Sequence, residues 1–135
     1  MKRAHIHLTV GDLDRSVAYY SALFGAAPDT SEAEYAKWSL SEPALNFAVS
    51  TGCGEAPGVS HVGIEVTGDG ALEEMDDRIA AGGLPVRRQA QTSCCYARSD
   101  KVWTADPDGL AWEVFRTDGQ GDAFAEAEAR RELTG

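Results

Sequence analysis

Two histidines occupy the same position in two copies of one sequence pattern. Residues 4–10 read Ala-His-Ile-His-Leu-Thr-Val and residues 60–66 read Ser-His-Val-Gly-Ile-Glu-Val, so His5 and His61 correspond at an offset of 61 − 5 = 56 residues. Each copy is followed by a turn and an amphipathic stretch. A repeat of this length holds several secondary elements, and it predicts two βαβββ modules. Equivalent first strands would then carry both imidazoles to one shared cavity.

The length of the chain limits how these modules are organised. With 135 residues, of which 43% are hydrophobic, the chain can bury one compact core but not two independent ones. We therefore predict a single α+β domain, residues 1–135, whose modules form a shared, partly open, eight-stranded, barrel-like sheet around a metal cavity. Module one spans about residues 1–50 and module two about 59–116. The tail, 117–135, is rich in Ala, Glu and Arg and is given no chemical role.

Hydrophobic periodicity predicts the individual elements. Residues 4–10 alternate as a strand, with Ile6 and Leu8 on the apolar face and His5 and His7 on the other. Asp12 and Gly25 are the predicted caps of a helix that ends at about residue 24. Further strands are predicted at 34–40, 45–50, 60–66, 86–92, 96–104 and 110–116, with a second helix at 71–81, a linker at 51–58 and a turn at 106–109.

Charge and cysteine content exclude several classes of partner. The formal net charge is −10, from 22 acidic and 12 basic residues, so the chain repels phosphate backbones and anionic lipid headgroups. We expect no nucleic-acid and no membrane partner. The sequence shows no signal-peptide core and no apolar run of about 20 residues, which predicts a cytoplasmic protein. Its three cysteines, two of them adjacent, are expected to be free thiols.

The repeat also points to a third metal ligand. Glu113 lies in the last predicted strand of module two, where module one carries Asn46. We therefore predict that His5, His61 and Glu113 bind a metal and leave coordination positions open, as in non-haem Fe(II) oxygenases, although Mn, Co, Ni or Zn would also suit these ligands. His7 faces the same side as His5 and is a competing candidate ligand, but His5 is preferred because it is the residue that corresponds to His61. The alternative is that each of these residues has only a structural role.

A second group of candidate residues begins at the adjacent cysteines, Cys94 and Cys95. Adjacent side chains of a strand point to opposite faces, so the two thiols can hold one atom only where the backbone turns. Such a dithiol suits trivalent arsenic or cadmium, and Cys53 in the linker would supply a third sulfur. The alternative is that these cysteines are small buried hydrophobic residues.

Two residues near the cysteines are further candidates. Lys101 is predicted to neutralise an anionic intermediate; the alternative is a solvated lysine at a strand edge. Tyr96 is expected to lie beside a substrate; the alternative is a place in the core.

Over about residues 4–116 the sequence resembles the vicinal oxygen chelate superfamily, which includes glyoxalase I, extradiol dioxygenases and the fosfomycin and bleomycin resistance proteins. More narrowly, it resembles the branch of organoarsenical carbon-arsenic lyases and cadmium-induced proteins. The segments that carry this resemblance are Ser-His-Val-Gly at 60–63, Thr-Ser-Cys-Cys-Tyr-Ala at 92–97, Asp-Lys-Val-Trp at 100–103, Asp-Pro-Asp-Gly at 106–109 and Trp-Glu at 112–113. The cysteine-containing segment is the specific one. Many relatives have Gly or Ala where this chain has His7, so this histidine departs from the pattern of the branch. An extra imidazole near the metal would alter the choice of ion or the ligand assignment.

The resemblance implies an Fe(II)-dependent and dioxygen-dependent lyase that removes the methyl or aryl group of trivalent organoarsenicals and releases arsenite. It assigns His5, His61 and Glu113 to the metal, and Cys94 and Cys95 to arsenic. Two alternatives stay open: a thiol protein that sequesters cadmium or arsenite without turnover, and another chemistry of the superfamily. A homodimer is also left open.

Overall fold

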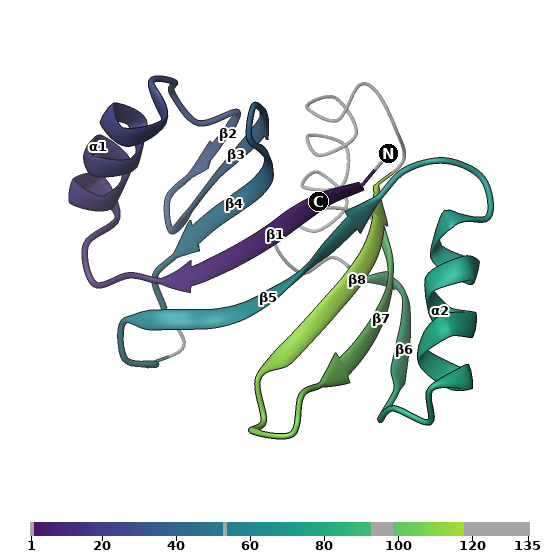
Figure 1. The fold of residues 1–135 in the computed structure, drawn as a ribbon. Helices are drawn as coiled ribbons and strands as arrows, with labels where there is room; N and C mark the ends of the chain where they lie inside the picture. The colour runs from purple at the N-terminus through teal and green to yellow at the C-terminus, as the bar shows by residue number, and fades with distance from the viewer. Residues whose placement is uncertain (1, 53, 93–98, 118–135) are drawn as a thin grey trace. The chain divides into compact units, whose positions relative to one another are not determined.

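The computed structural model describes residues 2–52, 54–92 and 99–117 (Figure 1). Contacts divide the chain into two compact units, and each is described by itself. The N-terminal unit comprises residues 4–62, and the C-terminal unit comprises residues 1–3 and 63–135. Neither of the two described helices is long and apolar enough to cross a membrane.

The N-terminal unit follows the order strand, helix and three strands (Figure 1). Its elements are β1 (Lys2–Thr9), α1 (Leu13–Phe24), β2 (Thr30–Glu32), β3 (Tyr35–Ser41) and β4 (Ala44–Ser50). The strands lie in the order β2-β3-β4-β1. β1 runs parallel to β4, whereas the pairs β2·β3 and β3·β4 are antiparallel. The last strand of the module therefore returns to lie beside the first.

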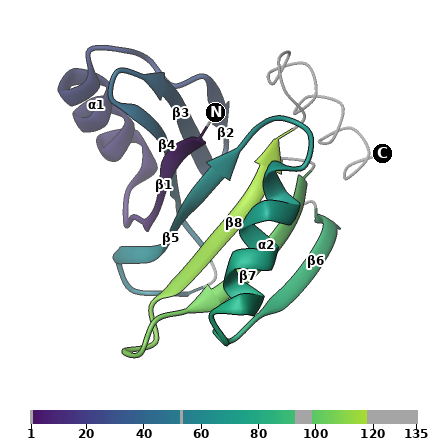
Figure 2. The same cartoon turned by 45° about the vertical axis from the view of Figure 1, so that its right-hand side comes forward.

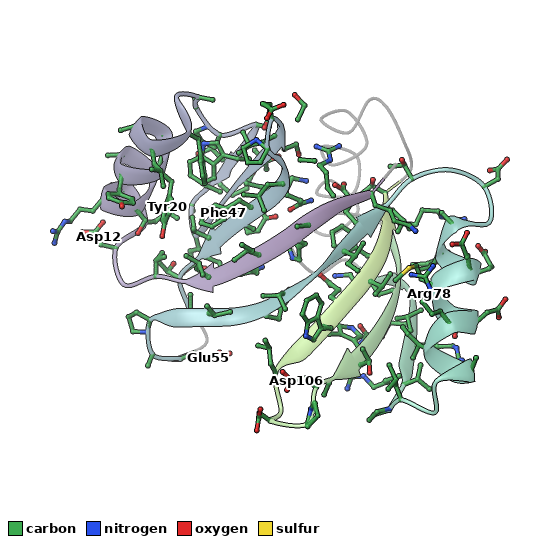
Figure 3. The ribbon with its side chains drawn as sticks, in the orientation of Figure 1. Asp12, Tyr20, Phe47, Glu55, Arg78 and Asp106 are labelled. Carbon is green, nitrogen blue, oxygen red and sulfur yellow. The ribbon has the colours of Figure 1, made fainter. Side chains whose placement is uncertain are left out.

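Helix α1 begins and ends where the sequence predicts. The Asp12 side chain accepts a hydrogen bond from the backbone N–H of Arg15, and Gly25 ends the helix with a positive φ of 70°. The apolar side of α1 packs on the sheet, where the Tyr20 ring points toward Phe47 of β4 with 4.6 Å between the ring centroids (Figure 3). This packing buries the apolar faces of β1, β3 and β4.

The C-terminal unit repeats the same element order. It contains the end of β5 (Gly58–Val66), then α2 (Ala71–Ala81), β6 (Arg87–Thr92), β7 (Ser99–Ala105) and β8 (Ala111–Thr117). Its strand order is β5-β8-β7-β6, and α2 covers one face of these strands (Figure 2). Leu72, Met75 and Ile79 of α2 are buried in the core of this unit. A bidentate contact from Arg88 on β6 to Asp76 of α2 lowers the pKa of the Asp76 carboxyl.

The predicted fold class is confirmed. The eight strands form one mixed sheet in the order β2-β3-β4-β1-β5-β8-β7-β6, with two helices, so each βαβββ module contributes four strands. The predicted turn is also present, because Asp106 accepts hydrogen bonds from the backbone N–H groups of Asp108 and Leu110. The position of strand β2 was not predicted, since its three residues lie in a segment that reads as a loop and are too few to show a period.

Candidate metal centre

The site begins with the polar face of β1. His5, His7 and Thr9 alternate with Ile6 and Leu8, and the two aliphatic residues pack toward α1. The sequence suggests a half-buried strand, but the polar face is buried as well: His5 is 6% exposed and His7 is 5% exposed. Buried imidazoles require polar partners, because an unsatisfied buried donor or acceptor costs about 1–3 kcal/mol.

Asn46 of β4 supplies these partners for His5. The two residues are paired in the parallel ladder of β1 and β4. The Nδ1 atom of His5 lies 3.1 Å from the Asn46 carbonyl oxygen and 3.0 Å from its side-chain Oδ1. Because a backbone carbonyl can only accept, Nδ1 carries the proton and donates, and in the neutral ring the lone pair is on Nε2. A metal-binding histidine is typically oriented in this way by its second nitrogen.

His61 of β5 faces the Nε2 atom of His5. Its Nε2 lies 3.3 Å from the Nε2 of His5, and the ring centroids are 5.2 Å apart. Two imidazole nitrogens that bind one ion at about 2.1 Å, at angles between 90° and 109°, are about 3.0–3.4 Å apart. The separation of the two Nε2 atoms therefore fits a divalent metal. The Nδ1 of His61 is 3.2 Å from the Ser60 hydroxyl, which provides its outer hydrogen bond.

His7 is the third member of this cluster. Among the described residues, His5, His7 and His61 form a group whose potential ligand atoms all lie within 4.8 Å of one another. The ring of His7 is 4.8 Å from that of His61 and 6.2 Å from that of His5. Sequence reasoning placed His7 on the correct face but did not assign it to the metal, because the corresponding residue in the second copy of the repeat is Gly63, which has no ligand side chain.

Glu113, the predicted carboxylate ligand, lies in the C-terminal unit and is 3% exposed. Its Oε2 accepts a hydrogen bond from the ammonium group of Lys101, and both side chains are buried. The Lys101 Nζ is also 5.9 Å from the ring centroids of Trp103 and Phe115. The alternative of a solvated strand-edge lysine is therefore wrong. Lys101 fixes the orientation of the Glu113 carboxylate.

Replacing Lys101 with methionine is expected to destabilise the protein by about 3–5 kcal/mol, because Glu113 would remain buried without its cation. Urea unfolding of metal-free protein measures this loss. The double variant Lys101→Met/Glu113→Leu should recover much of it, since both charges are then removed. Glu74→Gln is the matched control: it removes the exposed contacts to Arg78 and Lys2, which are worth at most about 1 kcal/mol. Equal losses for the buried and exposed pairs would contradict the prediction.

The pairing of β3 with β4 and of β7 with β8 reveals a second residue type, lysine, that is repeated in both modules. The sequence pattern alone did not show it. Lys37 pairs with Ala48, two residues after Asn46, and Lys101 pairs with Phe115, two residues after Glu113. Both lysines are buried. Their offset is 101 − 37 = 64, whereas that of Asn46 and Glu113 is 113 − 46 = 67, because the turn at 106–110 is three residues longer than the turn at 42–43. This correspondence supports the predicted equivalence of Asn46 and Glu113 within their modules.

The cysteine-containing part of the prediction is not tested by the structure. Cys53, Cys94, Cys95 and Tyr96 lie outside the described residues. Their assignment to arsenic stays a prediction.

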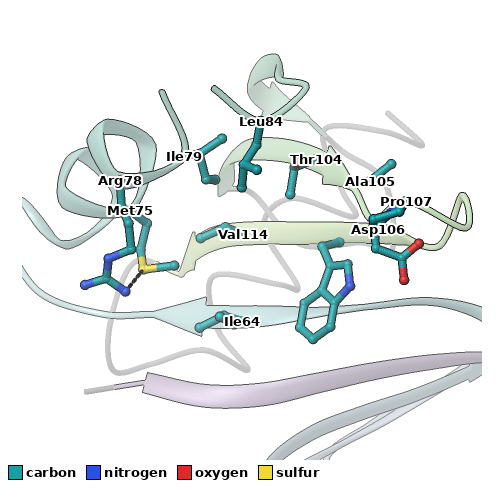
Figure 4. A pocket seen from close by; sticks show the side chains of 11 residues that line it. Ile64, Met75, Arg78, Ile79, Leu84, Thr104, Ala105, Asp106, Pro107 and Val114 are labelled. Atoms are coloured by element: carbon teal, nitrogen blue, oxygen red, sulfur yellow. Dashed lines mark hydrogen bonds between the residues drawn. The ribbon is translucent and has the colours of Figure 1, made fainter. Parts of the chain in front are cut away.

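A cavity of about 380 Å³ lies between α2 and the strands of the C-terminal unit (Figure 4). Its lining is mainly apolar, and Trp112 and Val114 of β8 contribute to it. The Thr104 hydroxyl, which also lines it, is buried and has no hydrogen-bond partner among the described residues. Since neighbouring side chains of a strand alternate between faces, Glu113 points to the opposite side of β8. This cavity is therefore not the predicted metal cavity.

The sequence of the chain matches a known family over most of its length. The profile of the Glyoxalase/Bleomycin resistance protein/Dioxygenase superfamily matches residues 2–114. The chain belongs to this superfamily. Within it, the chain is 36% identical over 129 residues to a trivalent organoarsenical cleaving enzyme of Thermomonospora curvata, covering 95% of this chain and 85% of that protein. It is 31% identical over 124 residues to the cadmium-induced protein CadI of Mycobacterium bovis, covering 92% and 82%.

Solved structures share the fold of this chain. Homoprotocatechuate 2,3-dioxygenase from Arthrobacter globiformis matches with a TM-score of 0.66 and 17% identity, over 96% of this chain and 40% of that one. At this identity the similarity supports the fold alone. It agrees with the eight-stranded sheet of two βαβββ modules described above.

Proposed function

We propose that this protein cleaves the carbon-arsenic bond of trivalent organoarsenicals in an Fe(II)-dependent and dioxygen-dependent reaction that releases arsenite. The observation that carries this proposal is the 36% identity, over 95% of the chain, to a relative named for cleaving trivalent organoarsenicals. The pair of imidazoles on β1 and β5, with His5 buried and His61 half-buried, supports a metal-dependent reaction.

In this proposal His5, His61 and Glu113 hold the metal. Bound there, Fe(II) would supply the binding and activation of dioxygen. Asn46 orients the ring of His5, and Lys101 orients the carboxylate of Glu113. This set of three metal ligands remains a proposal made from the sequence, because Glu113 belongs to the C-terminal unit and the two histidines belong to the N-terminal unit. The role of Lys101 in neutralising an anionic intermediate also stays a prediction.

The thiols of Cys94 and Cys95 would bind trivalent arsenic, with Cys53 as a third sulfur and Tyr96 beside the substrate. Thiolates are soft ligands that match this soft ion. Holding arsenic at two points fixes its carbon substituent relative to the metal, and such positioning supplies much of the catalysis in reactions of this kind. The cytoplasmic location and the homodimer stay predictions.

Arsenic speciation tests the proposed function. Purified protein loaded with Fe(II) is incubated with methylarsenite in air and, separately, without oxygen. Release of inorganic arsenite in air but not without oxygen is the expected result. Stoichiometric retention of the arsenical under both conditions would refute turnover and favour the sequestering alternative. Oxygen-independent release would contradict the dioxygen requirement.

A further inference from the structure

We infer that His7 is a third imidazole ligand of the metal that His5 and His61 bind. This inference rests on the metal site of the proposed function but not on its arsenical substrate. It changes the composition of the site, because the chain would contribute three neutral nitrogen ligands from two strands of one unit.

The first argument is the position of the rings. The centroid of His61 is 5.2 Å from that of His5 and 4.8 Å from that of His7, so the ring of His61 has both β1 histidines as neighbours. An ion bound between His5 and His61 therefore lies next to His7. Two nitrogens on opposite sides of one ion would be about 4.2 Å apart, and the potential ligand atoms of all three histidines already lie within 4.8 Å of one another. The three rings would have to move closer together to bind one ion.

The second argument is the hydrogen bonding behind each ring. His5 is held by Asn46, His61 contacts the Ser60 hydroxyl, and the Nε2 of His7 lies 2.8 Å from the Ser50 hydroxyl. Each imidazole thus uses one of its two ring nitrogens for an outer partner. Metal-binding histidines show this arrangement, because the outer hydrogen bond orients the ring and selects the nitrogen that faces the metal.

The third argument is the location of His7 on β1. It is 5% exposed and faces away from the aliphatic residues that pack on α1. Its two neighbours on the same face are His5 and Thr9, both buried. A packing role on this polar face needs no imidazole, since threonine occupies the next equivalent position of the same strand. A ligand role does need one.

A third imidazole has a chemical consequence. It adds no negative charge, and it leaves fewer coordination positions for water or other small molecules. Imidazole-rich sites suit Fe, Co, Ni and Zn, whereas carboxylate and water ligands suit Mn. His7 should therefore strengthen the binding of Co(II) more than that of Mn(II).

Cobalt binding tests this inference without arsenical or dioxygen. The full chain is stripped of metal and titrated with Co(II) and with Mn(II), and the Co(II) form is studied by proton NMR, in which each bound imidazole that retains an N–H gives one shifted, exchangeable signal. We expect three such signals in the wild type and two in His7→Ala. We also expect His7→Ala to weaken Co(II) binding by more than about tenfold, the lower limit for losing an outer-shell partner, with a smaller effect on Mn(II).

Two further variants make the result interpretable. Thr9→Val changes the neighbouring buried position of β1 without removing an imidazole, so it should keep three signals and the wild-type affinity. His7→Gln keeps most of the side-chain volume and replaces the alanine variant if that one does not fold. Two signals in the wild type, or wild-type Co(II) affinity in both His7 variants, would overturn the inference. Loss of arsenite release with an intact three-signal spectrum would instead contradict only the proposed function.

Discussion

Replacing Gly63 with alanine is expected to destabilise the protein more than the same replacement at any other glycine that the structure describes. A Cβ atom built at Gly63 would lie 2.0 Å from the backbone carbonyl oxygen of Glu113 and 3.0 Å from the carbonyl carbon. These are backbone atoms of β8, so no side-chain rotation can relieve the overlap. The alanine methyl group can fit only if β5 and β8 move apart.

The expected loss is more than about 3 kcal/mol, the upper end of the usual cost of overpacking a core. Since domains of this size are typically stable by about 5–15 kcal/mol, the melting temperature should fall by more than about 10 °C. Thermal unfolding followed by circular dichroism measures this change. The same movement would displace the backbone of Glu113.

Gly11→Ala is the matched control. A Cβ at Gly11 would meet only the Pro57 side chain, at the ordinary contact distance of 3.7 Å, and the backbone of Gly11 does not need a positive φ. Its effect should stay within about 0.5 kcal/mol. A melting temperature of Gly63→Ala close to that of Gly11→Ala would show that β5 and β8 do not approach each other as described.

Much of the fold could be predicted because its signals are local. The alternation of residues 4–10 predicts the strand and its two faces, and Asp12 and Gly25 mark the ends of α1 through caps that depend on neighbouring residues alone. The internal repeat then predicts the number of strands. β2 was missed because three residues cannot display a period of two.

The site was harder to predict because its decisive properties depend on burial and pairing across strands. The sequence places His5 and His7 on one face, but only the register with β4 shows that Asn46 fixes the His5 tautomer. Likewise, the contact between Lys101 and Glu113 depends on the pairing of β7 with β8. His7 was not assigned to the metal because its counterpart in the second copy of the repeat is Gly63, not a histidine. Comparing the two modules identifies ligand residues that both contain, but it cannot identify a ligand residue that only one module contains.

Replacing Cys95 with serine is expected to abolish the release of arsenite from methylarsenite. Trivalent arsenic binds thiolates, and a serine hydroxyl is neither a soft ligand nor ionised at neutral pH. Without the second sulfur, the arsenical would no longer be held at two points, so the positioning of its carbon substituent would be lost. The metal content should not change, since no sulfur belongs to the proposed ligand set. Arsenic speciation and elemental analysis of the same preparation measure the two properties.

Cys53→Ser separates this role from a general loss of thiols. If Cys94 and Cys95 form the arsenic site, Cys53 contributes at most a third sulfur, so its removal should weaken methylarsenite binding and still permit oxygen-dependent release of arsenite. The comparison also distinguishes an enzyme from a sequestering protein, because a sequestering protein would release no arsenite in the wild type or in either variant. Wild-type rates of arsenite release in Cys95→Ser would refute a catalytic role for this thiol, whatever metal the histidines bind.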